Sequence, residues 1–417
     1  MKYLQRAIKI HGLCLVVGLL ISQIYLANIA NAQTFSFEEG RKKSALDFNL
    51  VKNLIIIPLH INGKGPYNFI LDTGVGPLII TEPSLLDTLG LKNLRTTKIY
   101  GLGEGEEIEA FITSELNVKV KEASIQHIPT AILKKDVFNL SSYLGKEIHG
   151  IIGYYFFNSF VVKINYSTKR LAFSSPLAKT KKKGTKFPIE IQNKKPYVMV
   201  DLLTPQQKNI KAKLIIDCGA SHALSMEALD GAAFPLPDST IEANLGIGLS
   251  GPITGHVGRI PQLSIGKYSF KNILSGFPAY EAVAAQIGYN TQNGNLGAEF
   301  LRRFDTTYDY QNNAIYLKPN QAYKANFDHD MSGIEVYIDP NNKKRYFIGR
   351  IEPGSPAEKA GFKEQDEIVS LDFKWIVLFS LEEVTNLFKS SEGKTVVVEV
   401  LREDKSIVKL LKLKRRI

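Results

Sequence analysis

Short runs of apolar residues, separated by polar and glycine-rich turns, follow one another along most of this chain. Residues 54–61 and 67–71 are two such runs, and the turn Asn62-Gly63-Lys64-Gly65-Pro66 lies between them. Apolar runs of five to eight residues bounded by Gly, Pro and Asn are typical of β-strands joined as hairpins. Helical patterns are short, as at 83–89, where Gly90 follows the last apolar residue. We therefore expect a mostly β protein.

The pattern occurs twice. The run 67–71 ends at Asp72-Thr73-Gly74, and the run 213–216 ends at Asp217-Cys218-Gly219. Each turn is followed by a glycine-spaced segment, at 101–105 and at 246–251, and then by an apolar segment with glycine, at 149–153 and at 293–297. Landmarks repeated in the same order predict an internal duplication, here of one mostly β lobe. In the second copy we expect a short helix at 225–229.

These motifs resemble the signature of the aspartic proteases, especially the bacterial retropepsin-like proteins. The segment 150–157 (Gly-Ile-Ile-Gly-Tyr-Tyr-Phe-Phe) is similar to the strand that crosses behind the catalytic turn in that family. The resemblance implies two pseudo-symmetric acid-protease-like β lobes, no cofactor and no metal. It makes Asp72 and Asp217 the catalytic pair, and it makes Thr73, Gly74, Cys218 and Gly219 the residues that support the two catalytic turns.

Two carboxylates held close together cannot both ionise, so they share one proton and can act as base and acid on a peptide bond. In the resembled family, the hydroxyl after each aspartate bonds across the lobe interface. Thr73 keeps that hydroxyl, whereas Cys218 supplies a thiol, a poorer donor and acceptor. Two hypotheses stay open: an aspartic-type endopeptidase with a loosened site, or a catalytically degenerate peptide-binding protein. Because Val75 and Ala220 offer no hydroxyl to the carboxylates, we expect activity to peak above about pH 3.

The glycine-spaced segments are candidate flaps that would close over a substrate, with Gly101, Gly103, Gly246 and Gly248 as their flexible positions. Plain surface hairpins are the alternative for each. The segment 246–251 also fits a dinucleotide-binding fingerprint, but the following Pro252-Ile253-Thr254 predicts extended chain where that motif needs a helix.

The last segment, 331–417, contains Pro353-Gly354-Ser355-Pro356-Ala357 and an amphipathic pattern at 381–388. It resembles a PDZ domain of the bacterial type. The resemblance implies that an extended peptide binds as an added strand and that Ser332, Gly333 and Ile334 capture its C-terminal carboxylate. The stretch 373–375 (Phe-Lys-Trp) replaces the usual Asn-Gly turn, and we expect Trp375 to pack in the core.

The ends and linkers complete the predicted organisation. Residues 1–32 have a positive start, an apolar run and a small-residue end, which predicts a signal peptide and an exported, periplasmic or secreted protein. The other predicted segments are lobe 1 at 33–174, a linker at 175–186, lobe 2 at 187–319, a second linker at 320–330 and the PDZ domain at 331–417.

Net charge and cysteine content limit the partners and the disulfides that we expect. The net charge of +11 in 417 residues falls to +8 once Lys2, Arg6 and Lys9 are removed with the signal segment. Basic runs at 179–183 and 409–416 lack the aromatic or glycine-rich motifs of nucleic-acid binding, so we expect no nucleic-acid partner. Membrane contact is expected only through the signal segment before cleavage, and peptides or unfolded proteins are the expected partners. Cys218 is then the one remaining cysteine, which excludes an intramolecular disulfide.

Overall fold

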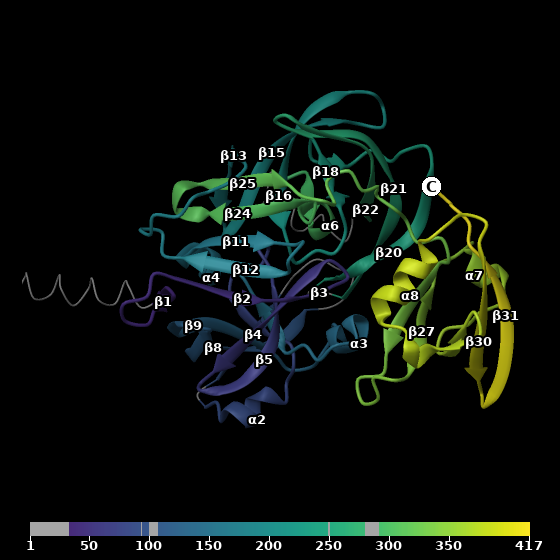
Figure 1. Ribbon diagram of the computed structural model, residues 1–417, viewed down its shortest axis with the longest axis horizontal. Coiled ribbons are helices and arrows are strands. Elements are labelled where there is room, and N and C mark those ends of the chain that lie inside the picture. The colour runs from purple at the N-terminus through teal and green to yellow at the C-terminus, as the bar shows by residue number, and fades with distance from the viewer. Residues whose placement is uncertain (1–32, 93, 100–106, 249–250, 280–291) are drawn as a thin grey trace, which may run out of the picture.

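The computed structural model describes residues 33–92, 94–99, 107–248, 251–279 and 292–417. β-Sheets dominate these residues and form two lobes with a smaller unit beside them (Figure 1), so the expected fold class is confirmed. The predicted signal segment, 1–32, lies outside the described residues. Within the described residues, no helix combines the length and the apolar character needed to span a bilayer.

The first lobe is a single sheet with the order β1-β9-β6-β10-β5-β4-β8-β7, and β3 pairs with β4. Its strands are β1 (Ser36–Phe37), β3 (Asn49–Val51), β4 (Leu54–Ile61), β5 (Lys64–Leu71), β6 (Leu78–Ile80), β7 (Arg95–Ile99), β8 (Ile108–Val120), β9 (Ala123–Leu133) and β10 (Gly150–Ile152). The predicted short helix is α2 (Leu85–Leu89), which ends at Gly90 in a left-handed conformation, and α3 (Leu140–Leu144) precedes β10. Since β5 and β10 run parallel with buried residues along both, the apolar run before Asp72 is an interior strand.

The second lobe repeats the plan. Its strands are β14 (Glu190–Gln192), β15 (Lys195–Leu203), β16 (Asn209–Asp217), β17 (Leu224–Met226), β20 (Thr240–Gly248), β21 (Gly251–Ile265), β22 (Tyr268–Pro278) and β23 (Gly294–Gly297). The parallel pairs β5–β10 and β6–β9 find their counterparts in the parallel pairs β16–β23 and β17–β22. The antiparallel pairs match as well, so the internal duplication is confirmed by strand pairing and not only by sequence landmarks.

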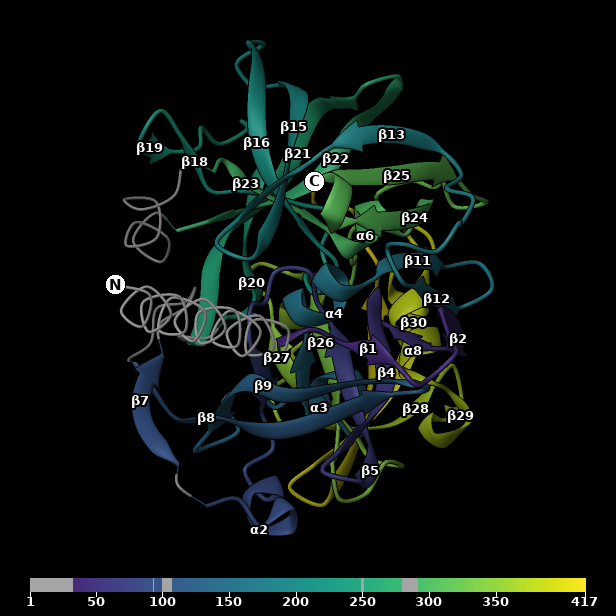
Figure 2. The same cartoon turned by 90° about the vertical axis from the view of Figure 1, so that its left-hand side faces the viewer.

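A six-stranded sheet joins the lobes, in the order β13-β25-β24-β11-β12-β2. It consists of β2 (Lys43–Asp47), β11 (Val161–Asn165), β12 (Arg170–Ser174), β13 (Thr185–Pro188), β24 (Phe304–Asp309) and β25 (Ala314–Pro319). Three strands come from each half, and β11 meets β24 antiparallel at the centre, where the two lie side by side in Figures 1 and 2. This arrangement places a pseudo-twofold axis between the lobes. Residues 185–186, predicted as linker, already belong to β13.

Two local predictions were wrong. Residues 225–229 form β17 and β18 (Ala228–Leu229) instead of a helix, because β17 is held between β22 and β23, and β18 pairs with β19 (Ala232–Ala233). The segment 150–157 is not one strand: β10 ends at Ile152, and α4 (Tyr154–Ser159) follows. In the second lobe, α6 (Ala298–Leu301) takes the place of α4.

The two lobes share one hydrophobic core that extends from Phe35 to Phe327. Phe157 of α4 packs on Tyr308 in β24 and on Tyr310 in the one-turn helix η2 (Tyr310–Asn312), with ring centroids 5.0 and 5.7 Å apart. Tyr155, Phe156 and Phe157 are therefore core residues, and Phe157 joins lobe 1 to lobe 2.

The last unit has its own core, between Met331 and Leu413. It contains β26 (Ile334–Ile338), β27 (Tyr346–Ile351), α7 (Pro356–Lys359), β28 (Glu367–Leu371), β29 (Lys374–Trp375), η3 (Ile376–Leu378), α8 (Leu381–Phe388), β30 (Thr395–Arg402) and β31 (Lys405–Lys412). The sheet order is β26-β27-β28-β30-β31, with β29 attached to β28, so β26 and β31 are its edges. The amphipathic helix predicted at 381–388 is confirmed, and Ser380 and Glu383 form a capping box at its start. Trp375 is not in the core, since 64% of its surface is exposed.

Candidate functional site

Asp72 and Asp217 occupy equivalent positions, each where an interior strand of its lobe ends. Asp72 follows β5, and its backbone N–H donates to the Ile152 carbonyl at 2.9 Å. Asp217 is the last residue of β16 and lies opposite Gly297 of β23. Because each strand is fixed on both sides by neighbours in the sheet, the two carboxyl groups have little freedom to move apart.

The structure brings these two carboxyl groups together and joins them by a hydrogen bond. The Gly74 N–H donates to Asp72 Oδ1 at 2.6 Å, and the Gly219 N–H donates to Asp217 Oδ1 at 2.9 Å. Each turn glycine thus orients the carboxylate of its own lobe. The expected facing pair is present in geometry, with the same contacts made from both halves.

Burial raises the pKa of Asp72 well above its ordinary value, and the charge of Asp217 and the hydrogen bond to it raise the pKa further. The Gly74 N–H and the charge of Lys195 act in the opposite direction, and burial and Asp217 outweigh them. Asp72 therefore keeps its proton at a pH where an ordinary aspartic acid has lost it. A pair of carboxyls that shares one proton can donate and accept at once.

The second turn accepts only glycine. A Cβ placed on Gly219 would lie 2.1 Å from Asp72 Cγ, and one on Gly74 would lie 3.0 Å from Asp217 Oδ2. Heavy atoms do not approach to 2.1 Å without a bond, so any side chain at Gly219 would displace the carboxyl group of Asp72. The two carboxyl groups can therefore approach each other because Gly74 and Gly219, which lie beside them, have no side chains.

Thr73 and Cys218 cross the lobe interface beneath the carboxyl pair. Thr73 Oγ1 donates to the Ile216 carbonyl at 2.6 Å and accepts from the Cys218 N–H at 3.0 Å. Cys218 Sγ donates to the Leu71 carbonyl at 3.3 Å, which is the contact symmetry-related to the one from Thr73 to Ile216. The thiol thus takes the position of the hydroxyl and makes a weaker form of the same bond. Burial raises the pKa of this thiol, so it is neutral and not a nucleophile.

A second pair of contacts across the lobes was not predicted from the sequence. Asn53, in the β3–β4 turn, donates from Nδ2 to the carbonyl of Ser221, four residues after Asp217. Lys194, in the equivalent β14–β15 turn, lies against Gly76, four residues after Asp72, and donates from Nζ to the Tyr155 hydroxyl at 3.1 Å. Each lobe therefore supports the aspartate-containing turn of the other lobe. A polar pair occupies the same place in both turns, Lys52-Asn53 and Asn193-Lys194, and this repeat was the available signal.

The candidate flaps are partly described. Gly101 and Gly103 lie outside the described residues, and β7 and β8 pair up to Ile99 and Ile108 on either side of them. In the second lobe, Gly248 of β20 pairs with Gly251 of β21, and Gly246 lies at a bulge with φ of 134°, a conformation that favours glycine. Both hairpins are thus confirmed as hairpins, and their movement over a substrate stays a prediction.

In the PDZ domain, the predicted carboxylate-binding loop already holds a carboxylate. The N–H groups of Ser332 and Gly333 donate to Asp330 Oδ1 at 2.9 and 2.7 Å, and the Ile334 N–H donates to Ser332 Oγ at 2.9 Å. Burial raises the pKa of Asp330, while these donors favour its charged form. A peptide carboxylate would have to displace Asp330 in order to use the loop.

The groove between β26 and α8 faces the protease-like lobes, and two side chains of lobe 1 lie in it. Tyr143 of α3 packs on Tyr337 of β26 with ring centroids 5.8 Å apart, and its hydroxyl bonds to Ser221. Lys52 Nζ lies 3.5 Å from the centre of the Tyr143 ring, and burial lowers the pKa of Lys52 to about 8. Tyr143 therefore touches the PDZ domain and the second catalytic turn at the same time.

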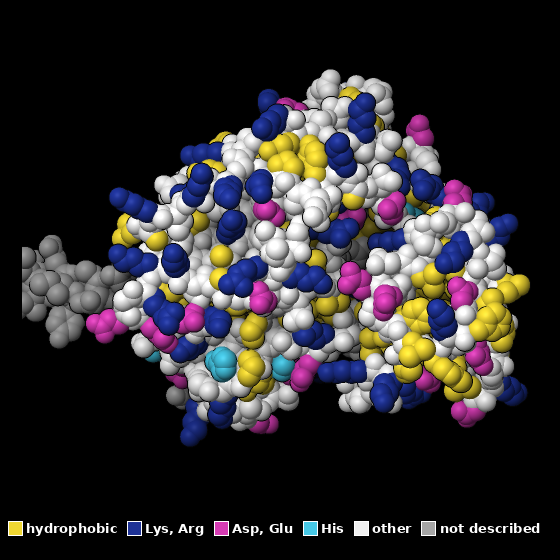
Figure 3. Space-filling view, viewed as in Figure 1, with side chains coloured by type: hydrophobic (Ala, Val, Ile, Leu, Met, Phe, Trp, Pro, Cys, Tyr) yellow, Lys and Arg dark blue, Asp and Glu magenta, His cyan; other side chains and the backbone are white. Residues whose placement is uncertain are grey.

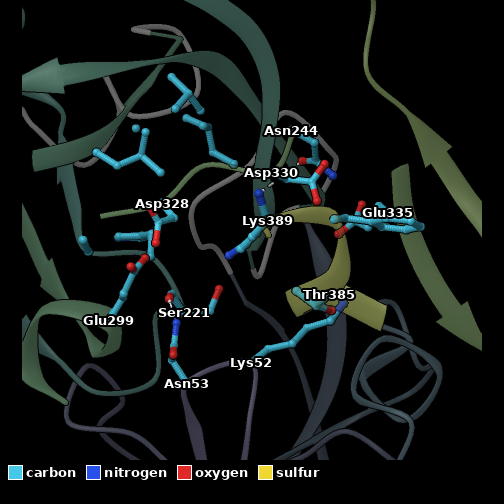
Figure 4. Close-up of a pocket in the computed structure, with 18 of the residues that line it drawn as sticks. Lys52, Asn53, Ser221, Asn244, Glu299, Asp328, Asp330, Glu335, Thr385 and Lys389 are labelled. Atoms are coloured by element: carbon cyan, nitrogen blue, oxygen red, sulfur yellow. Dashed lines mark hydrogen bonds between the residues drawn. The ribbon is translucent and has the colours of Figure 1, made fainter. Parts of the chain in front are cut away.

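A cavity of about 550 Å³ remains at this junction (Figure 4). Lys52 and Asn53 enter it from lobe 1, Ser221 and Glu299 from lobe 2, and Glu335, Thr385 and Lys389 from the PDZ domain. The walls contain both signs of charge, which suits a mixed-sequence peptide better than a single ion.

Within the described part of the chain, no three His, Cys, Asp or Glu side chains gather in a way that could hold a metal ion. His222, which follows the second turn, bonds to Asn295 and not to Cys218. The site is therefore built from carboxylates, hydroxyls and backbone amides.

Comparison with known proteins agrees with this geometry. Residues 57–156 match the aspartyl protease family, and residues 347–402 match the PDZ domain. Among solved structures, the chain is similar to a retropepsin-like aspartic protease from Rickettsia conorii, with 17% identity, 34% of this chain and 96% of that chain covered, and a TM-score of 0.25. The search of curated proteins gave no match. An aspartyl protease domain and a PDZ domain are thus both present, which confirms the resemblance stated from the sequence.

Proposed function

We propose that this protein is an aspartic-type endopeptidase that hydrolyses peptide bonds with Asp72 and Asp217. The observation that carries the proposal is the hydrogen-bonded pair of carboxyl groups, each held by the N–H of a glycine two residues further on. Two acidic side chains are rarely placed in contact for structural reasons, because two like charges held close together destabilise the fold. A protein that retains such a pair at the junction of two duplicated lobes has a use for the shared proton.

The chemistry follows from that proton. Water lies between the carboxyls and attacks the carbonyl carbon of the peptide, and its proton passes to the ionised carboxylate. The proton that the two carboxyls share passes from the other carboxyl to the carbonyl oxygen. The tetrahedral species then collapses as one carboxyl gives its proton to the leaving nitrogen and the other carboxylate takes a proton from a hydroxyl of that species, which restores the one-proton pair. No covalent bond to the enzyme forms.

Digestion of an unfolded protein across a pH series tests the proposal. Wild type should cleave it, with a maximum above about pH 3, and Asp72→Asn or Asp217→Asn should each lower kcat by at least about 1000-fold. Asp201→Asn, at an exposed site on β15, is the matched control and should cleave as wild type does. Cleavage by both dyad variants at the wild-type rate would remove the dyad from the mechanism.

A non-catalytic peptide-binding protein is the second candidate, and Cys218 is the observation that favours it. Its thiol bonds to Leu71 at 3.3 Å where a hydroxyl would bond more strongly. Cys218→Thr should raise kcat if the protein is an enzyme with a loosened dyad. If neither form cleaves while both bind peptide, the binding protein is correct.

We further propose that the PDZ domain recruits peptide ends or unfolded segments to the protease lobes. The junction cavity between β26, α8 and the second catalytic turn supports this role, since a strand added to β26 would lie beside Ser221. Export to the periplasm or beyond is proposed from residues 1–32, and N-terminal sequencing of the exported protein should read Gln33-Thr34-Phe35.

A further inference from the structure

The PDZ domain has a solvent-exposed apolar face that the rest of the described chain leaves uncovered. At the β28–β29 turn, Phe373 is 84% exposed and Trp375 is 64% exposed. Four further apolar residues that follow in the chain are each more than half exposed: Val377, Leu378, Val408 and Leu410. Single exposed apolar residues are ordinary, whereas a group of six large ones on one small domain is not.

Strand register places four of these residues, Phe373, Trp375, Val408 and Leu410, together. Trp375 lies opposite Ser370, Ser370 opposite Glu399, and Glu399 opposite Val408. Directly opposed residues on neighbouring strands share a face of the sheet, so Trp375 and Val408 are on the same side. On the next rung Leu410 lies opposite Val397, and the Asp372 N–H donates to the Val397 carbonyl, which brings the Phe373 turn to this rung. We call this surface the apolar PDZ face.

The backbone of Phe373 has a conformation that bulky side chains disfavour. Asp372 and Phe373 have φ of 47° and 63°, the left-handed conformation that favours Asn-Gly or Asp-Gly in a two-residue hairpin turn. A bulky aromatic residue at such a position is strained, and here its side chain points into solvent, where it gains no packing. Exposure and strain at one residue indicate that the ring is used by something outside the described chain.

The apolar PDZ face lies away from the protease lobes. In Figure 1, β31 is at the right-hand edge of the molecule, beyond β30 and α8, and in Figure 3 apolar side chains gather over this edge. A flat object could therefore approach the face without touching the junction cavity or the carboxyl pair.

The charged side chains near the apolar PDZ face indicate what binds to it. Two exposed lysines border these side chains: Lys374 lies between Phe373 and Trp375 in the chain, and Lys412 is on the same side of β31 as Leu410. Glu399 is the acidic residue within the face, and its carboxylate already accepts from the hydroxyls of Ser370 and Ser406. Exposed apolar and aromatic side chains beside exposed lysines match the surface of an anionic bilayer.

We propose that the apolar PDZ face docks on membranes that contain anionic lipid, with Phe373 and Trp375 entering the headgroup region. Tryptophan prefers that region because its ring is apolar and its N–H is polar. This contact is additional to the membrane contact expected from the signal segment. It would hold the protease at a surface while the cleavage site stays in water.

Trp375 is the only tryptophan in the chain, so its fluorescence reports this face alone. The mature protein, residues 33–417, is titrated with vesicles of equal parts phosphatidylcholine and phosphatidylglycerol. Emission should shift to shorter wavelength as vesicles are added, and added salt should weaken the shift. Pure phosphatidylcholine vesicles should bind about tenfold more weakly, because they lack the anionic charge.

Phe373→Gly separates binding from folding. It gives the turn an Asp-Gly sequence, so the thermal midpoint should rise or stay unchanged, whereas vesicle affinity should fall about tenfold with the loss of the ring. Lys412→Glu should weaken binding to the anionic vesicles alone. Leu177→Ser, at a 94% exposed residue in the linker between the lobes, is the matched control and should bind as wild type does.

Two outcomes would overturn the proposal. One is an emission spectrum that no vesicle composition changes. The other is a blue shift that depends on protein concentration without vesicles, together with dimers in sedimentation, which would make the face an interface between two copies.

Discussion

Asp72 and Asp217 show how single residues are tuned by what the fold places beside them. Both end apolar strands of similar sequence, yet their surroundings differ, because Lys195 lies near Asp72 and Glu227 lies near Asp217. The two halves are equal in topology and unequal in electrostatics, so a dyad with two distinguishable members follows from an imperfect duplication.

Asp72→Asn should make the protein more stable at neutral pH. The folded pKa of Asp72 is raised above its unfolded value, so its contribution to stability is complete below about pH 4 and is lost as pH rises through the folded pKa. Asparagine carries no charge at any pH and avoids that loss. Urea unfolding should show a gain of the order of 1 kcal/mol at neutral pH and little gain near pH 3. A variant less stable than wild type at neutral pH would contradict the raised pKa.

Gly219→Ala should lower kcat by about 100-fold or more while the fold persists. The new Cβ would lie 2.1 Å from Asp72 Cγ, and displacing that carboxyl by about 1 Å costs on the order of 100-fold in kcat. Gly76→Ala is the matched control, since its Cβ would meet only Lys194 Cδ at 3.4 Å. Steady-state kinetics of the two variants should therefore differ sharply, and equal activities would place the carboxyls elsewhere during catalysis.

At the scale of elements, α3 and the β3–β4 turn act on a domain far along the chain. Tyr143 and Lys52 lie against the edge of β26, where a peptide strand would pair, so the PDZ groove is partly filled by the protein itself. A Cβ on Gly145 would come within 2.5 Å of Ile338 Cδ1, which shows how tightly the end of α3 fits there.

Tyr143→Ser should open the groove and strengthen peptide binding by about tenfold, because binding would no longer require the ring to move. Tyr143→Phe keeps the ring and loses only the hydroxyl bond to Ser221, so it should bind as wild type does. Fluorescence anisotropy with labelled peptides measures both. Peptides with free and amidated C-termini should bind equally, since Asp330 already occupies the loop amides; a strong preference for the free carboxylate would show that Asp330 gives way.

For the whole molecule, the distribution of cores predicts two unfolding units. The lobes share one core and a central sheet, whereas the PDZ domain has a separate core. Ile348→Ala in the PDZ core should lower its stability by about 2–5 kcal/mol and leave the lobes unchanged, and Phe157→Ala should act on the lobes in the same way.

Trp375 fluorescence follows the PDZ transition, and far-UV circular dichroism follows both. A single transition that both substitutions shift equally would show that the junction at Tyr143 couples the two units more strongly than their separate cores suggest.

Much of the fold could be predicted from the sequence because strand signals are local. The hairpin at 62–66, the capped helix at 381–388 and the helix stop at Gly90 depend on residues within a few positions of one another. The helix predicted at 225–229 failed for the opposite reason. Its residues pair with β22 and β23, distant strands whose hydrogen bonds outweigh a weak local preference.

The sequence by itself determined that this protein has two copies of one β lobe and that each copy ends an interior strand at an aspartate. Those facts follow from the periodicity of apolar residues and from the repeated turns, and both depend on residues that are close together in the sequence. Only the tertiary structure decided that Cys218 bonds to Leu71, that Asn53 and Lys194 support opposite turns, and that Asp330 fills the PDZ loop. These contacts join residues far apart in the chain, and their geometry depends on how whole sheets pack, which local sequence does not encode.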